Sequence, residues 1–224
     1  MRQAPTAPRR WRHLLATALA TVGLAAGAGL VPVQATQAPQ QPSESALFQS
    51  EEKRRGNPDA YNFFRFNKRI VHWNRCGAIG YRVFVKGAPD KGLRDAQEAM
   101  RRVNVATGLK FRYRGTSRVK PNQTGANYAA GTDLVVGWLP KQRFNGNVGL
   151  GGWQANGRGR ITSGFVMINR SYKLRRGFGP GPVSGYQGTT GQILMHEAAH
   201  SVGLQHVKDK AQIMYPTMRR RPAT

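Results

Sequence analysis

Residues 192–216 read QILMHEAAHSVGLQHVKDKAQIMYP, and they contain three of the chain's five histidines, His196, His200 and His206. His196 and His200 are four residues apart, so on a helix both imidazoles project from the same face and can share one metal ion. Gly203 permits the left-handed turn that ends such a helix. His206 can then return to the same ion, which predicts a three-histidine metal site.

A glutamate stands directly after the first of these histidines. Glu197 can lie beside the metal without ligating it, and this is the place of a proton acceptor in metal-assisted hydrolysis. Three neutral histidines on Zn²⁺ leave a fourth position for water, which is typical of a catalytic zinc site. Because Cys76 is the only cysteine, neither an intramolecular disulfide nor a cysteine-based zinc site can be built.

The spacing His-Glu-x-x-His-x-x-Gly-x-x-His, followed by Met214, resembles the signature of the metzincin zinc proteases. The eight-residue step from His206 to Met214, with Asp209 between them, and the sequence Met-Tyr-Pro resemble the matrixin branch. The likeness extends over roughly residues 73–218. Its upstream segments are Ile79–Val83, Ala106–Phe111 and Thr132–Gly137.

The resemblance implies an α/β (α+β) fold of the metzincin type, with a twisted mixed sheet, two long helices and a methionine turn at Met214. It implies a zinc endopeptidase that hydrolyses internal bonds of a protein or peptide through a zinc-bound water activated by Glu197. Matrixins usually carry a second zinc and several calcium ions, but only His13 and His72 remain outside the motif and acidic residues are scarce. We therefore expect one zinc ion and no calcium.

In matrixins the substrate adds to an edge strand, and Gly151, Gly152 and Trp153 are our candidates for that edge. A glycine loop around a core tryptophan is the alternative for these three residues. Pro216 is a candidate for the wall of the specificity pocket. Only eight residues follow Pro216, too few for the third helix of the family, so we expect that helix to be missing.

Cys76, in Arg75-Cys76-Gly77, resembles the matrixin latency segment, in which a propeptide thiolate occupies the fourth zinc position. The match ends after these three residues. A buried or half-buried thiol is the favoured interpretation, and a zinc-blocking thiol and intermolecular pairing are the alternatives.

Hydrophobic patterns predict strands and helices outside the motif. Alternating or short apolar runs predict strands over residues 79–85, 109–113, 133–138, 148–153 and 165–168. Apolar residues at helical spacing predict an amphipathic helix over residues 91–107, ended by Gly108. Thr189 and Gln192 form a capping box that starts the second helix. The order strand, helix, strand predicts an α/β-type domain.

The N-terminal region has the composition of a targeting segment. Residues 1–35 combine four arginines, an uncharged apolar run and the small-x-small site Val33-Gln34-Ala35, which predicts a signal peptide and a secreted protein. An uncleaved membrane anchor is the alternative. Residues 36–72 are predicted to be a linker or short pro-segment and residues 73–224 the catalytic domain, with no membrane span after cleavage.

The chain carries a net charge of +25, and removal of residues 1–35 leaves +21. Such a surface either attracts an anionic cell-envelope polymer or is simply solvated. Because the charges do not form one long basic run, we expect no specific nucleic-acid partner. We expect a monomer. A zinc amidase acting on envelope peptides and a cationic binding protein with a vestigial zinc site are alternative functions. The intact Glu197 argues against the second, because binding alone does not need it.

Overall fold

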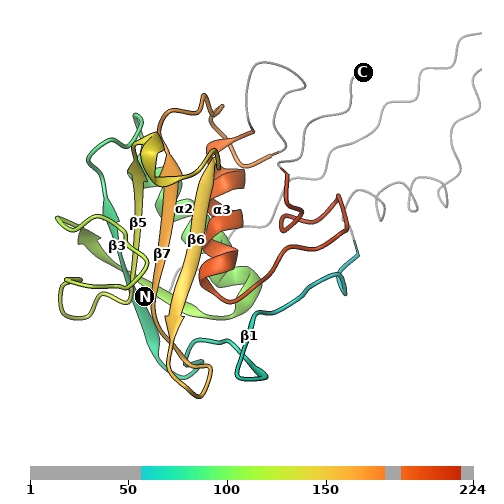
Figure 1. The fold of residues 1–224 in the computed structure, drawn as a ribbon. Coiled ribbons are helices and arrows are strands. Elements are labelled where there is room, and N and C mark those ends of the chain that lie inside the picture. The colour runs from blue at the N-terminus through green and yellow to red at the C-terminus, as the bar shows by residue number, and fades with distance from the viewer. Residues whose placement is uncertain (1–56, 180–187, 218–224) are drawn as a thin grey trace, which may run out of the picture. The chain divides into compact units, whose positions relative to one another are not determined.

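The computed structural model describes residues 57–179 and 188–217, and it shows a sheet with helices α2 and α3 on one face (Figure 1). The expected signal peptide, residues 1–35, lies outside the described residues. The sheet strands are β3 (Ala78–Phe84), β4 (Lys110–Thr116), β5 (Leu134–Leu139), β6 (Gly149–Ala155) and β7 (Ile161–Asn169). The helices are α2 (Gly92–Thr107) and α3 (Thr190–Ser201), with a 3₁₀ turn at Lys141–Arg143.

The five strands form one mixed sheet in the order β4-β3-β5-β7-β6. Neighbouring strands are parallel except for β6, which runs antiparallel to β7 and forms one edge of the sheet. Each predicted strand is present, so the predicted α/β fold with a mixed sheet and two helices is confirmed, and it is consistent with the metzincin type. The antiparallel edge strand is the element that borders the site described below.

Both faces of the central strands are covered. All six residues of β5 are buried, which explains its unbroken apolar sequence. On one face, side chains such as Val136 and Val166 pack in the core with Ile193 and Leu194 of α3. On the other face a smaller cluster contains Phe84, Val135, Leu139, Phe144, Phe165 and Met167.

Helix α2 matches the predicted span. Its apolar side chains Ala96, Ala99, Met100 and Val103 are buried, and Gly108 ends the helix with a φ of +69°. A left-handed residue at this position suits glycine, since it has no Cβ. Helix α2 packs against α3 and thereby supports the helix that carries the histidines.

Residues 57–72, part of the segment 36–72 that is predicted to be a linker or short pro-segment, are folded in the described structure. Val71 is fully buried in the core, and the short strands β1 (Arg65–Phe66) and β2 (Arg69–Ile70) form a hairpin. Its two turn residues, Asn67 and Lys68, have φ values of +48° and +64°, as a tight two-residue hairpin turn requires. The domain therefore includes residues 57–72. In the described ranges, no helix combines the length and apolar character needed to cross a membrane.

Candidate metal centre and substrate cleft

Helix α3 begins as the sequence predicts. The Thr189 side chain accepts a hydrogen bond from the Gln192 backbone N–H at 3.3 Å, which satisfies one of the free donors at the helix start. The reciprocal half of the capping box is not formed, because Oε1 of Gln192 is buried without a partner in the described structure. The helix is buried along most of its length and packs against both the sheet and α2. His196 and His200 are therefore held on a rigid element.

The chain leaves α3 through a sharp turn at Gly203, which has a φ of +97°. A Cβ at this position would lie 2.6 Å from the Val71 carbonyl oxygen, so glycine is required for both conformation and space. The Gly203 carbonyl accepts a hydrogen bond from the Phe64 backbone N–H at 2.8 Å. This turn directs the chain back toward the helix and brings His206 to it.

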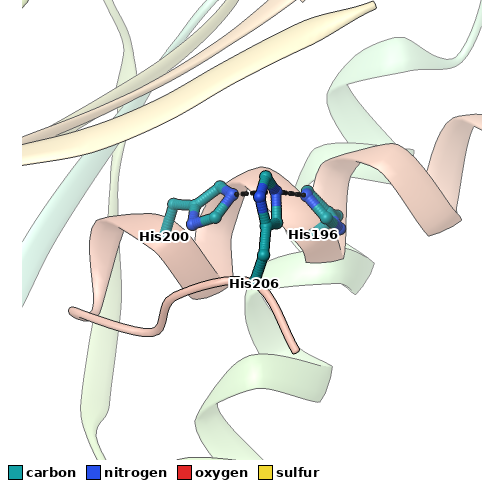
Figure 2. Close-up of side chains that lie close together, drawn as sticks. All are labelled: His196, His200 and His206. Carbon is teal, nitrogen blue, oxygen red and sulfur yellow. Dashed lines mark hydrogen bonds between the residues drawn. The ribbon is translucent and has the colours of Figure 1, made fainter. Parts of the chain in front are cut away.

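The three imidazoles converge on one point (Figure 2). Nε2 of His206 lies 3.1 Å from Nε2 of His196 and 3.1 Å from Nε2 of His200. Nitrogens at tetrahedral positions around Zn²⁺, each about 2.05 Å from the ion, are about 3.3 Å apart, so this spacing fits a shared zinc ion. The donor set is therefore that of a three-histidine zinc site.

Backbone carbonyl groups fix the orientation of two of the rings. Nδ1 of His196 donates to the Ile213 carbonyl at 2.7 Å, and Nδ1 of His200 donates to the Leu204 carbonyl at 2.7 Å. With the proton on Nδ1, the lone pair of Nε2 points toward the shared centre. Burial lowers the pKa of His196 to about 4 and also lowers the pKa of His200 and His206. All three rings are thus held in the neutral form that binds metal.

Glu197 is 5% exposed and lies against the edge strand β6. A Cβ at Gly149 would lie 2.7 Å from the Glu197 side chain, and one at Gly151 would lie 1.9 Å from the Glu197 carbonyl oxygen. These two glycines allow the strand to approach the helix this closely. Burial raises the pKa of Glu197 to about 8, while a hydrogen bond with the Gly151 backbone acts in the opposite direction. The carboxyl group is therefore poised to exchange a proton near neutral pH.

Met214 is buried, with 4% of its surface exposed. Its carbonyl oxygen accepts a hydrogen bond from the Val207 backbone N–H at 3.0 Å, which closes the loop that carries His206. The preceding residue, Ile213, holds the ring of His196. The methionine turn therefore connects a helix-borne histidine with the loop-borne one.

A cleft of about 1380 Å³ opens beside the histidines. The predicted site residues Gly151 and Pro216 line it, whereas Gly152 and Trp153 do not. A Cβ at Gly152 would meet the Phe165 ring at 2.6 Å, so this residue faces the opposite side of the sheet. Trp153 contacts Phe64, with ring centroids 5.7 Å apart. Residues 151–153 form part of a strand, not a glycine loop.

The sequence does not indicate that residues 57–64 support the loop that carries His206. The Asn57 backbone N–H donates to Oδ2 of Asp209 at 2.8 Å, and the Asn62 side chain donates to Oε1 of Gln205 at 2.8 Å. The Gln205 backbone N–H donates in turn to the Asn62 carbonyl at 2.8 Å. Residues 57–64 and the loop are more than a hundred positions apart, and only the folded chain brings them together.

The expectation of a buried or half-buried Cys76 thiol is wrong, because the residue is exposed. Cys76 stands just before β3, where its backbone N–H donates to Oδ1 of Asn74 at 3.2 Å. It is not among the residues that line the cleft.

The fold and the histidine geometry together define a metzincin-like zinc centre. The sequence model of the matrixin family matches residues 182–224, the segment that contains the three histidines, Glu197 and Met214. A search of curated protein sequences found no match to the chain. The family match and the triad support a matrixin-like zinc site, and with it a zinc metallopeptidase.

Proposed function

We propose that the protein is a secreted zinc endopeptidase that hydrolyses internal peptide bonds. The observation that carries this proposal is the buried carboxyl group of Glu197, which lies against the edge strand and lines the same cleft as the three histidines. His196, His200 and His206 would hold the zinc ion, which when bound polarises a water molecule and the scissile carbonyl group. A site that only stores metal has no use for a buried proton acceptor beside it.

The edge strand β6 supplies a binding mode for an extended peptide. Among the described strands, β6 is paired on one side only, with β7, and three of its residues, Gly149, Leu150 and Gly151, line the cleft. An incoming peptide can add as an antiparallel strand through main-chain hydrogen bonds. Because an edge strand contacts the chain on both sides of the reacting bond, this mode favours cleavage within a peptide and not at its end.

Glu197 moves the proton in this scheme. Its carboxylate takes a proton from the attacking water and delivers it to the nitrogen of the departing amine, so that the amine leaves in neutral form. Burial raises the pKa of Glu197, which makes its carboxylate a stronger proton acceptor. The Gly151 backbone next to it keeps the carboxyl group in place.

Cleavage of an unfolded protein by the Glu197→Gln variant tests the proposal. We expect wild-type activity to vanish on zinc chelation, to return when zinc is restored, and to fall about 10²- to 10⁴-fold in the variant, the usual contribution of a general acid-base group. Glu98→Gln is the matched control, because Glu98 is a half-buried glutamate on α2 that pairs with Arg101 and Arg102.

Three results would contradict the proposal. One is equal cleavage by wild type and Glu197→Gln, and another is a lack of cleavage by the zinc-loaded wild type. The third is cleavage of cross-linked envelope peptides but of no protein, which would favour the amidase. Secretion has its own test, since the N-terminus of protein recovered from the culture medium should begin after residue 35.

A further inference from the structure

Five exposed cations lie on two adjacent segments near the C-terminal end of β6, and we call this group the basic end. Two segments supply them, the β1–β2 hairpin and the turn between β6 and β7, which lie near one another in Figure 1. The members of the basic end are Arg65, Lys68 and Arg69 of the hairpin and Arg158 and Arg160 of the turn.

Backbone contacts hold the two segments together. The His72 backbone N–H donates to the Gly159 carbonyl at 3.0 Å, and the Ile161 backbone N–H donates to the His72 carbonyl at 2.8 Å. A Cβ at Gly159 would lie 3.4 Å from Cβ of Arg69, so the turn packs directly on the hairpin. The Asn156 side chain accepts the backbone N–H groups of residues 158 and 160 and fixes the turn. The basic end is therefore part of the fold.

The charges of the basic end are not neutralised within the described structure. The ion pairs in the described structure join Glu98 to Arg101 and Arg102, and Arg176 to Asp95. None of them involves a member of the basic end. The only side-chain hydrogen bond that a member makes to another of the described residues is from Arg65 to the Lys68 carbonyl at 3.2 Å. The charged groups of Lys68, Arg69, Arg158 and Arg160 therefore remain available to an anionic partner, and so does most of the Arg65 guanidinium group.

The direction of β6 places the basic end relative to a bound peptide. Strand β6 begins at Gly149, against Glu197, and ends at Ala155, next to the turn that carries Arg158 and Arg160. A peptide antiparallel to β6 has its N-terminal part at the Ala155 end. Phe64, which precedes the hairpin, lines the cleft and contacts His200, with ring centroids 6.2 Å apart, so the hairpin adjoins the reacting centre.

We propose that the basic end binds an acidic segment of the substrate on the N-terminal side of the scissile bond. This inference rests on the proposed endopeptidase function and adds a substrate preference to it. From Gly151 the strand runs four residues to Ala155, and the basic turn lies just beyond it. At about 3.3 Å per residue, the acidic segment should lie about four to seven residues before the scissile bond.

Two fluorogenic peptides test the proposal. Both contain one cleavage site chosen by profiling a proteome-derived peptide library with the full-length, zinc-loaded protein. At the positions four to seven residues before that site, one peptide carries Asp-Asp-Asp-Asp and the other carries Asn-Asn-Asn-Asn. Wild type should cleave the acidic peptide with about fivefold higher kcat/KM, mainly through KM, because each exposed ion pair is weak. Raising the ionic strength should reduce that ratio.

The variant Arg158→Gln/Arg160→Gln removes two cations from the basic end. Its ratio of acidic to neutral cleavage should fall close to one. The control, Arg112→Gln/Arg114→Gln, removes two exposed cations from β4 at the opposite edge of the sheet and should keep the wild-type ratio. Zinc content and thermal unfolding of both variants, measured in parallel, identify any loss of folding.

The outcomes separate this inference from the function on which it rests. If wild type cleaves both peptides at the same rate, or if both double variants lose the preference equally, the basic end does not select substrates. If the zinc-loaded wild type cleaves no peptide of the library, the endopeptidase proposal fails and the inference fails with it.

Discussion

The helix and the loop hold their parts of the metal site in different ways. His196 and His200 stand on α3, which is stabilised by its own backbone hydrogen bonds and by burial in the core. His206 stands on the loop between Val202 and Thr217, which is braced by residues 57–64. The helix half therefore follows from local sequence, whereas the loop half depends on contacts between distant parts of the chain.

Loss of one histidine from each half should give the largest effect. His200→Ala and His206→Ala should each weaken zinc binding by roughly 100-fold or more, since loss of a group that only hydrogen-bonds to a metal ligand already costs about 10- to 100-fold. Competition with a chromogenic chelator measures the affinity. His72→Ala is the control, because His72 lies outside the triad. Unchanged zinc affinity in His206→Ala would mean that the loop does not complete the site.

The pH dependence of the unfolding free energy should report on the buried carboxyl group of Glu197, which lies on α3. In zinc-chelated protein, the folded state holds the Glu197 proton up to a pKa of about 8, against 4.5 for the unfolded state. The folded state thus binds more protons between these values, and Glu197 lowers stability as pH rises through them. Glu197→Gln should gain on the order of 4 kcal/mol relative to wild type by pH 8.

The histidines have the opposite effect on how stability changes with pH. Their pKa is lower in the folded state, so over the interval between the two pKa values the folded state binds fewer protons than the unfolded state. His196, with a pKa of about 4 against 6.5 unfolded, lowers stability as pH falls through this interval. Urea unfolding of wild type and of Glu197→Gln across pH 4 to 8 measures how the unfolding free energy of each protein changes with pH. A stability difference between wild type and Glu197→Gln that stays constant with pH would refute the buried-carboxyl assignment.

Gly203→Ala should disturb the junction between the two halves. The positive φ and the close Val71 carbonyl together should lower the unfolding free energy by about 2 to 3 kcal/mol and weaken zinc binding through displacement of His206. Gly108→Ala shares a positive φ but has open space around it, so it should cost only about 1 kcal/mol. Equal effects of the two substitutions on zinc affinity would show that the Val71 contact is unimportant.

The smallest effects should come from single hydrogen bonds at each half. Asn62→Ala removes the contact with Gln205 and should cost about 1 kcal/mol, together with a several-fold loss of zinc affinity. Thr189→Ala removes the helix cap and should also cost about 1 kcal/mol, but with little change in zinc affinity. Chemical unfolding and zinc competition distinguish the two. If Thr189→Ala changes zinc affinity more than Asn62→Ala, the brace is not what positions His206.

The sequence alone determined the elements that depend on neighbours along the chain. Helical spacing set α2 and α3, the positions of His196, Glu197 and His200 on one helix, and the turn at Gly203. These follow from backbone geometry, glycine conformation and capping, which act over a few residues. The match of the histidine spacing to a known family then extended this local pattern to a zinc site.

Only the tertiary structure decided the features that join distant segments. It placed residues 57–64 against the His206 loop, brought the glycines of β6 onto Glu197, turned Gly152 away from the cleft and left Cys76 exposed. It also gathered the cations of the basic end from two segments. Hydrophobic periodicity shows which residues are buried but not which segments meet, because contacts between distant residues depend on how the whole core packs.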